Sequence, residues 1–527
     1  MNTKTKSAGC GRGDLILPFA WLAIMMFIIA RAWVLCDGRL VFALDDPIIH
    51  MSVSEKLLGG TYGINAGEPS APSSSILWPF LLTVTEAVGW GLWGPLAINV
   101  CAMFAAVLLI ARMIREALPP LPPWGLSGLA WGAARLGLGL LACMACNSWG
   151  LVMTGMEHSL HLYAGLLFAM ACLRLAENPQ GEVRLLVAAA CVLPLIRFEG
   201  AAAAAAGLLL LLWLRRWRPA GCLAGLLMLE LAAWALFTYS QGLPVMPSSV
   251  QMKSALVSGI AGQDGLGRIV GLLLHNLKVS FALRQGALVL VLMVVLGLMA
   301  AASARLGQVR FTATLLLVAL AHVCFGQYGW FSRYEIYLLA LLIYAILAVG
   351  REFWLRRECV VTLGCLLAIV AAPYVRTALN APAAARSIYE QQVQMRRFAV
   401  DFWKQPVAVV DLGWVSYHNP AYVLDLEGLG SEEVRKLRKN GTFDAAHVEA
   451  LAQRHQVRLA MIYDERAGHV MPEMWRKVAV LRTSGVELPS DKVCFYLADP
   501  GLHDELIARL KAFEKGLPSG SKLEFLR

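Results

Sequence analysis

The sequence predicts a polytopic α-helical membrane protein of about eleven spans that ends in a small α/β domain outside the membrane. Of the 527 residues, 58% are hydrophobic, and the mean hydropathy is +0.60. Apolar runs of about 17–25 residues recur, which is the length that crosses a hydrocarbon core of about 30 Å. Residues 376–527 differ from the rest, because they carry 21 Lys and Arg and 19 Asp and Glu.

The net charge of +10 lies mostly among the predicted spans. Residues 376–527 contribute only +2 of it, so the other +8 falls within residues 1–375. Basic residues between spans usually mark cytoplasmic loops. We therefore expect membrane lipids rather than nucleic acid as the partner of these charges.

The first span is expected over Leu15–Cys36, after a basic start. This apolar run is longer than a signal-peptide core and lacks a clear small-x-small cleavage site. We interpret it as a retained span, with the N-terminus in the cytoplasm.

Basic clusters alternate with the later apolar runs, and this alternation threads the chain through the membrane. The clusters expected in the cytoplasm are Lys4/Lys6/Arg12, Arg112/Arg115, Arg174/Arg184, Arg215/Arg216/Arg218, Arg305/Arg310 and Arg351/Arg356/Arg357. The spans expected after the first are 94–114, 127–148, 158–175, 184–197, 200–214, 219–240, 285–304, 310–327, 334–350 and 359–375. Residues 76–92 do not fit as a further crossing, so we expect them at the outer interface or dipping in and returning.

This threading divides the chain into a membrane domain, 1–375, and an extracytoplasmic domain, 376–527. The membrane domain has a first outer loop at 37–75 and a long outer loop at 241–284. In the second domain, strand patterns alternate with amphipathic helical patterns, which is typical of an α/β fold. The strands are expected at Pro406–Leu412, Val457–Tyr463 and Val493–Leu497, and the helices at Ser431–Lys439 and Asp444–His455. Cys494 is the only cysteine after residue 376, so no disulfide forms within this domain.

Unusual polar residues fall in the predicted outer loops and turns. They are Asp45, Asp46 and His50 in the first loop, Glu157 and His158, Arg197 and Glu199, Lys253 in the long loop, and Arg333 and Tyr334. Ionisable residues near membrane depth are costly and usually line a cavity or pathway. Five separate outer segments therefore predict one water-accessible site at the outer face.

Simpler interpretations stay open for single members of this set. The pair Asp45 and Asp46 is also compatible with a solvated loop surface. Glu157 and Glu199 are also compatible with structural ion pairs to Arg197 or His158. An arginine at the end of a span, such as Arg333, can snorkel to the interface.

The order of the polar motifs resembles the GT-C family of membrane glycosyltransferases, which use polyprenyl-phosphate sugars. The motifs most resemble those of the mycobacterial terminal arabinofuranosyltransferases and of a bacterial pilin arabinosyltransferase. The likeness covers most of residues 40–430. Its motifs are Asp45-Asp46, the G-x-Y-G-x-N-x-G-E loop Gly60–Glu68, Ser73–Trp78, Thr154–Glu157, Arg197–Gly200, Pro247–Lys253, Ser332–Tyr334, Val410–Gly413 and Leu424–Leu429. This chain has His158 where the family's T-G-L-E-T has Thr, and Phe198 where its R-P-E-G has Pro.

The resemblance implies transfer of a sugar, with arabinofuranose as the best guess, from a polyprenyl-phosphate donor to a hydroxyl of a glycan or protein. It places the reaction at the outer face of a bacterial cytoplasmic membrane. Asp45 is expected as the general base, with Asp46 in support. Arg333, Lys253 and Arg197 are expected to bind the phosphate, and His50, Glu157, His158, Glu199 and Tyr334 to line the substrate site.

Three further alternatives stay open at this stage. Asp45, Asp46 and Glu157 could hold a divalent cation such as Mg²⁺, Mn²⁺ or Ca²⁺, since these ions prefer oxygen ligands. A transporter or flippase for a lipid-linked or anionic substrate would also carry charges along a path, but usually at the middle of the membrane. A non-enzymatic scaffold would explain the C-terminal domain but not the carboxylates.

Overall fold

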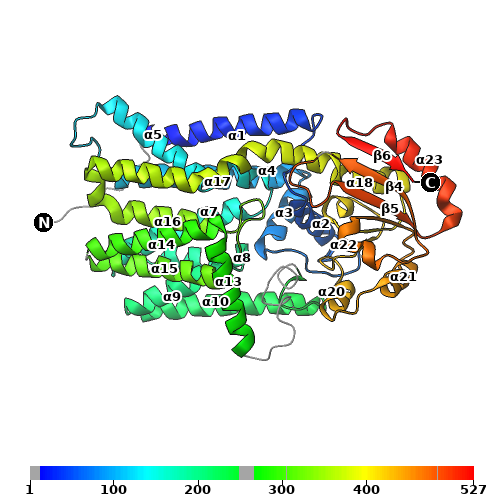
Figure 1. Ribbon diagram of the computed structural model, residues 1–527. Helices are drawn as coiled ribbons and strands as arrows, with labels where there is room; N and C mark the ends of the chain where they lie inside the picture. Colours follow the sequence, from blue (N-terminus) through cyan, green and yellow to red (C-terminus); the bar gives the residue numbers. More distant parts are fainter. Residues whose placement is uncertain (1–11, 249–265, 304, 484, 527) are drawn as a thin grey trace.

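The computed structural model describes residues 12–248, 266–303, 305–483 and 485–526. It consists of a long bundle of helices joined to a smaller α/β domain (Figure 1). In the described residues, nine helical segments are long and apolar enough to cross a membrane. The chain is therefore a polytopic α-helical membrane protein, as the hydropathy predicts.

The long apolar helices follow the predicted spans closely. They are α1 (Ile16–Leu35), α4 (Trp93–Ala117), α5 (Gly128–Ala145), α7 (His158–Glu177), α10 (Trp217–Ser240), α14 (Arg284–Ser303), α15 (Leu306–Phe325), α16 (Ile336–Val349) and α17 (Arg357–Glu390). Two shorter apolar helices, α8 (Arg184–Ile196) and α9 (Gly200–Trp213), occupy two further predicted spans. At 1.5 Å per residue, each of them is about 20 Å long. The total of eleven crossings stays a prediction.

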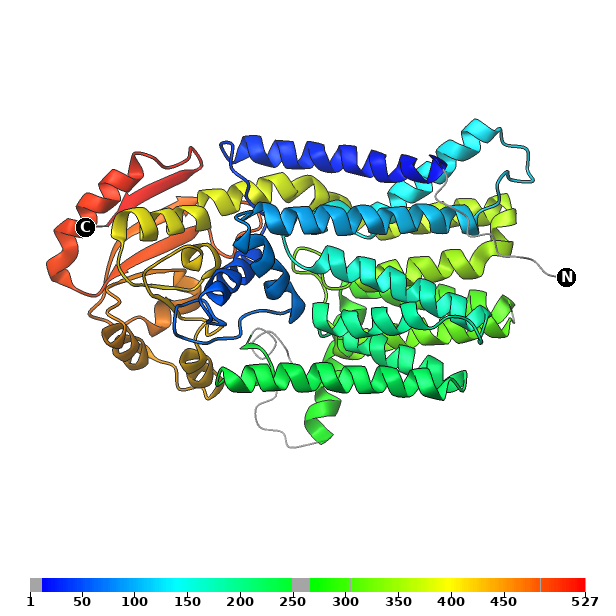
Figure 2. The ribbon, with the colours of Figure 1, turned by 180° about the vertical axis from the view of Figure 1, so that it is seen from behind.

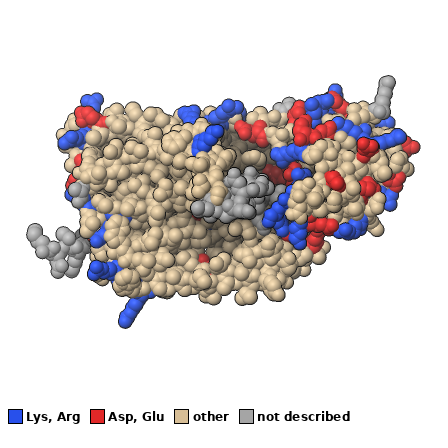
Figure 3. All heavy atoms as spheres, turned by 60° about the horizontal axis from the view of Figure 1, so that its bottom comes forward, with Lys and Arg blue, Asp and Glu red and all other residues tan. Residues whose placement is uncertain are grey.

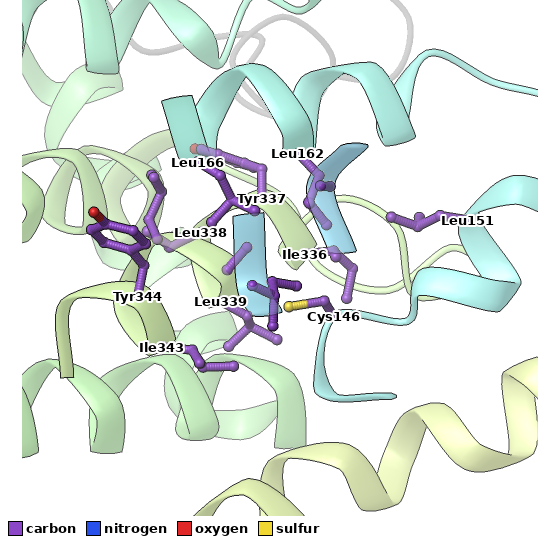
Figure 4. Packing of buried hydrophobic residues seen from close by; sticks show 14 of the residues in the cluster. Cys146, Leu151, Leu162, Leu166, Ile336, Tyr337, Leu338, Leu339, Ile343 and Tyr344 are labelled. Atoms are coloured by element: carbon purple, nitrogen blue, oxygen red, sulfur yellow. The ribbon is translucent and has the colours of Figure 1, made fainter. Parts of the chain in front are cut away.

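Helix α16 forms the centre of the bundle. All 14 of its residues are buried. Figure 4 shows its side chains near Leu162 and Leu166 of α7 and near Cys146 and Leu151, which precede α7 in the chain. Ile336, Leu339 and Ile343 lie in this cluster together with Leu162 and Leu166 of α7. A helix that is apolar on every side lies either in a protein core or in lipid, and the burial of all 14 residues places α16 in the core of the bundle. Residues just before α16 are therefore held firmly at one end of the bundle.

Basic residues gather at the end of the bundle that is far from the α/β domain. Arg115 pairs there with Asp14, Arg351 lies 3.6 Å from Glu177, and Arg305 pairs with Glu352. These pairs join segments that the threading places on one side of the membrane. The arrangement agrees with the predicted alternation of basic clusters.

The first predicted outer loop contains helix α2 (Asp46–Leu58), and it leads into α3 (Leu77–Ala87). Figures 1 and 2, seen from opposite sides, both place these two helices between the bundle and the sheet. With 11 residues, α3 is about 16 Å long and is not among the apolar helices that could span. This length fits the expectation that residues 76–92 do not cross.

The C-terminal domain contains a mixed sheet of six strands. They are β1 (Val407–Val409), β2 (Val423–Asp425), β3 (Leu459–Ile462), β4 (Arg476–Thr483), β5 (Lys492–Leu497) and β6 (Ser521–Phe525). The order is β2-β1-β3-β5-β4-β6, with β2, β1 and β3 parallel and the remaining pairings antiparallel. The helices of the domain include α18 (Gln392–Arg397), α19 (Gly413–Ser416), α20 (Glu432–Lys439), α21 (Ala445–Arg454), α22 (Asp464–Ala467) and α23 (His503–Glu514).

The predicted elements of this domain are confirmed where the sequence named them. Strands β1 and β3 fall within the predicted runs, and β5 begins one residue before its predicted run. Helices α20 and α21 begin after Ser431 and Asp444, whose side chains cap them. The predicted boundary at residue 375/376 differs from the structure, because α17 continues to Glu390 without a break. The long outer loop 241–284 also contains a helix, α13 (Leu266–Ala282).

Candidate active site

Asp45 lies directly before α2 and joins the membrane part to the C-terminal domain. Its Oδ2 accepts the backbone N–H of Gly413, and its Oδ1 accepts that of Trp414, both at 2.9 Å. The contact requires glycine, because a Cβ on Gly413 would lie 2.4 Å from Asp45 Oδ2. Burial, followed by the nearby charge of Asp411, raises the pKa of the Asp45 carboxyl well above its ordinary value.

Asp46 forms an ion pair with Arg333. The distance from Arg333 Nη2 to Asp46 Oδ2 is 2.5 Å. Arg333 is only 2% exposed, and its Nε and Nη1 groups have no hydrogen-bond partner among the described residues. Buried N–H groups without partners cost free energy. Arg333 therefore has N–H donors that no described residue uses.

A left-handed turn holds Arg333 in place. The residues Gly329–Ser332 have φ between +48° and +81°, and the backbone N–H of Arg333 donates to Gly329 O at 3.1 Å. This conformation is costly for residues other than glycine. Asn147 Nδ2 donates to Ser332 O at 2.9 Å, and the Gly329 N–H donates to Glu335 at 3.0 Å. The surrounding bundle thus imposes a turn that the local sequence does not favour.

Arg197 is enclosed by two glutamates. Its Nη1 donates to Glu157 at 2.6 Å, and its Nη2 and Nε donate to Glu199 at 2.8 and 3.2 Å. The guanidinium groups of Arg197 and Arg333 also lie 5.4 and 5.2 Å from the ring centroid of Tyr334. Glu157 and Glu199 therefore form structural ion pairs with Arg197. Arg333, in contrast, keeps N–H donors without a partner among the described residues.

The serine run of the first loop connects these groups to His50. Ser73 Oγ lies 2.9 Å from His50 Nδ1, and Ser74 Oγ donates to Glu157 at 3.3 Å. His158 is buried, and neither of its ring nitrogens has a hydrogen-bond partner among the described residues. The predicted site residues of four outer segments thus come together, whereas Lys253 lies outside the described residues.

A cavity of about 660 Å³ opens beside this cluster, between the bundle and the C-terminal domain. Asp45 and Asp46 line one side of it. The other side comes from the C-terminal domain and includes Gln392, Asp411 and Glu427. On the face seen in Figure 3, the surface is hollowed between the apolar helical part and the charged C-terminal domain.

The sequence reasoning missed part of this wall. Gln392 Nε2 donates to Asp411 Oδ2 at 3.0 Å, and Tyr463 Oη donates to the same oxygen at 2.5 Å. Asp411 belongs to the motif Val410–Gly413, but the residues next to it in the sequence do not indicate which side chains it faces. Its position two residues after the strand β1 was a usable signal. Ligands of parallel sheets usually bind outside the carboxyl ends of the strands.

The Gly60–Glu68 loop packs against the C-terminal domain. Asn65 exchanges two 3.0 Å hydrogen bonds with the backbone of Val423 in the edge strand β2. Tyr62 and Ile64 of this loop belong to the hydrophobic core of the C-terminal domain. The motif thus fastens the first outer loop to that domain.

An apolar groove of about 480 Å³ lies next to the polar cluster. Its lining comes mainly from α8, α9 and α10 and includes Pro194, Leu195 and Phe198. Phe198 lines the groove, whereas its two sequence neighbours, Arg197 and Glu199, belong to the polar cluster. Glu230 of α10 is the single ionisable residue among those that line the groove.

The three carboxylates expected to hold a metal do not form a shared site. Asp45 accepts from backbone amides, Asp46 from Arg333 and Glu157 from Arg197. In the described part of the chain, no group of three His, Cys, Asp or Glu side chains is arranged to hold a metal ion. A divalent cation at these carboxylates stays a prediction.

Residues 384–496 match the family model described as "Domain of unknown function (DUF8728)". The match covers the wall that the C-terminal domain contributes to the cavity, including Gln392, Asp411 and Glu427. No curated protein matches the chain in sequence.

Proposed function

We propose that this chain is a membrane glycosyltransferase of the GT-C type that uses a polyprenyl-phosphate sugar. The sugar, best guessed as arabinofuranose, passes to a hydroxyl of an acceptor at the outer face of a bacterial cytoplasmic membrane. One observation carries this proposal: an apolar groove, a buried arginine with free donors and a cavity lined by carboxylates lie next to one another.

Each of these three features suits one part of such a donor. The groove beside Phe198 suits the prenyl chain, which belongs in an apolar environment. Arg333 offers N–H donors and a positive charge to the phosphate. The cavity beside Asp45 is large enough for a sugar and an acceptor group and is open to polar ligands.

The transfer follows from these positions. Asp45 takes the proton of the acceptor hydroxyl, whose oxygen forms a bond to the anomeric carbon of the sugar. The bond from that carbon to the phosphate oxygen breaks, and its electron pair leaves with the polyprenyl phosphate. Arg333 stabilises the negative charge that develops on the phosphate. Asp46 fixes the direction of the Arg333 side chain through their ion pair.

Asp45 is better placed as the base than Asp46. Two backbone N–H groups fix its carboxylate, and each oxygen keeps a second lone pair. Its raised pKa makes it a stronger base than an ordinary aspartate. Asp46 already pairs with Arg333 through its Oδ2.

The test is transfer by the purified full-length protein in lipid nanodiscs. Polyprenyl-phosphate arabinofuranose and other polyprenyl-phosphate sugars are supplied with a mixture of envelope glycans, and released polyprenyl phosphate is measured. We expect release with at least one donor, and its loss in Arg333→Ala. Flux of the donor across proteoliposomes without any transfer would instead establish the transporter alternative.

A further inference from the structure

The C-terminal domain brings polar residues to one edge of its parallel strands. Asp411 follows β1, Glu427 follows β2 and Arg466 follows β3, and all three line the 660 Å³ cavity. Strand β1 lies between β2 and β3, so the strand order changes direction there. Crevices at this position, outside the carboxyl ends of parallel strands, are the usual ligand sites of such sheets.

An unpaired buried group on this wall indicates a missing ligand. Gln392 lines the cavity and is 1% exposed. Its Nε2 is within hydrogen-bond distance of Asp411 and Tyr463, but its Oε1 has no partner among the described residues. A hydroxyl or N–H donor from a ligand would satisfy this oxygen.

The charges of the cavity restrict what can enter it. The lining residues include five carboxylates and one arginine, namely Asp45, Asp46, Asp411, Glu427, Glu487 and Arg466. Carboxylate and amide oxygens accept hydrogen bonds, which suits a ligand rich in hydroxyl donors. Asp46 is balanced by Arg333, and Arg466 offsets one of the other four carboxylates, so an anionic ligand would still meet net repulsion from this wall. Trp330, which is 55% exposed, adds an aromatic face for the apolar side of a sugar ring.

We propose that this edge of the sheet binds the acceptor, and that the acceptor is a neutral glycan rather than an acidic one. This inference rests on the proposed function, because the bound hydroxyl must lie near Asp45. Gln392 and Glu427 accept hydrogen bonds from sugar hydroxyls, and the surplus of carboxylates rejects uronic acids and phosphorylated glycans. The C-terminal domain thus selects the acceptor, while the membrane part holds the donor.

Binding of oligosaccharides to the full-length protein without any donor tests this proposal. The probes are neutral arabinan, galactan and mannan hexamers, a galacturonan hexamer and a lysine-rich peptide, and the readout is saturation-transfer NMR in detergent micelles. We expect at least one neutral hexamer to bind and the galacturonan to bind at least tenfold more weakly. Equal binding of galacturonan, binding of the peptide alone, or no binding of any hexamer would overturn the proposal.

Variants locate the site. Gln392→Leu and Glu427→Gln should each weaken binding of the neutral hexamer at least tenfold, and Glu514→Gln, at the end of α23, should leave it unchanged. Gln392 also bonds to Asp411 and Tyr463, so its replacement can disturb the domain itself. Glu427→Gln is therefore included as a second, nearly isosteric change at the end of a different strand. Wild-type binding in both cavity variants would refute the assigned wall.

A separate measurement keeps this proposal distinct from the proposed function. Slow hydrolysis of the lipid-linked donor, with water in place of the acceptor, depends on Asp45 and Arg333 but not on the acceptor wall. Asp45→Asn and Arg333→Ala should therefore lose this hydrolysis, whereas Glu514→Gln should hydrolyse the donor at close to the wild-type rate. Loss of donor hydrolysis in the wild type with retained glycan binding would count against the transferase and not against the glycan site.

Discussion

The carboxylate of Asp45 accepts a 2.9 Å hydrogen bond from the backbone N–H of Gly413, which lies 368 residues further along the chain. The first residue belongs to the loop after α1, and the second begins α19 of the C-terminal domain. The proposed base is therefore oriented by a domain that lies outside the bundle. The proposed catalytic site is complete only when the two parts are in contact.

Replacing Asp45 with Asn should abolish most of the transfer. Asn has nearly the same size but cannot take a proton, and a general base contributes roughly 10²–10⁴-fold to rate. We expect a loss in that range, measured as initial rate, with a melting temperature showing that the protein is folded. Glu514→Gln is the control. Near-wild-type turnover by folded Asp45→Asn would move the base to Glu157 or Asp46.

Gly413→Ala should impair the enzyme without removing any ionisable group. The added Cβ would lie 2.4 Å from Asp45 Oδ2, so the carboxylate must shift from its position. We expect kcat to fall at least tenfold while the affinity for the donor changes little. The matched control is Gly221→Ala in α10, where a Cβ meets nothing within 4 Å. Equal kcat for the two variants would show that the position of Asp45 is unimportant.

Arg333 should be sensitive even to replacement by lysine. The two side chains are not equivalent in geometry, because an ammonium group lacks the planar fork that binds both Asp46 and a phosphate. We expect Arg333→Lys to raise the KM for the donor about tenfold and Arg333→Ala to raise it further. Arg356→Lys, at the exposed basic end of the bundle, is the control. Donor binding at wild-type strength by Arg333→Ala would remove the arginine from the phosphate site.

The pH dependence of transfer should report the raised pKa of Asp45. A base acts only when deprotonated, so the rate should rise with pH through this pKa, well above the ordinary aspartate value of 3.8. After burial, the charge of Asp411 is the next largest cause of the shift. Asp411→Asn should therefore move the acid limb of the profile of kcat/KM to lower pH. A limb that does not move would assign it to another group.

The C-terminal domain should lie outside the cytoplasm. The basic clusters of the described chain gather at the opposite end of the bundle, and such clusters usually face the cytoplasm. Alkaline phosphatase fused after residue 527 should be active, and a fluorescent protein that matures only in the cytoplasm should stay dark there. A bright fluorescent fusion would reverse the whole orientation.

The sequence by itself determined the class of protein and the approximate position of most helices. Spans depend on the length and polarity of single segments, and such local properties can be read directly from the chain. For the same reason, β1, β3, β5, α20 and α21 were predicted correctly. Strand β2, like β1, has only three residues, and the sequence did not single it out.

Only the tertiary structure decided how the polar residues pair. The sequence placed Asp45, Asp46, Arg197 and Arg333 at one face, but it did not show that the two arginines differ. Arg197 is satisfied by two glutamates, whereas the left-handed turn before α16 leaves donors of Arg333 free. These differences arise from the packing of segments that are far apart in the chain. No local pattern records that packing, since each contact depends on where every other helix lies.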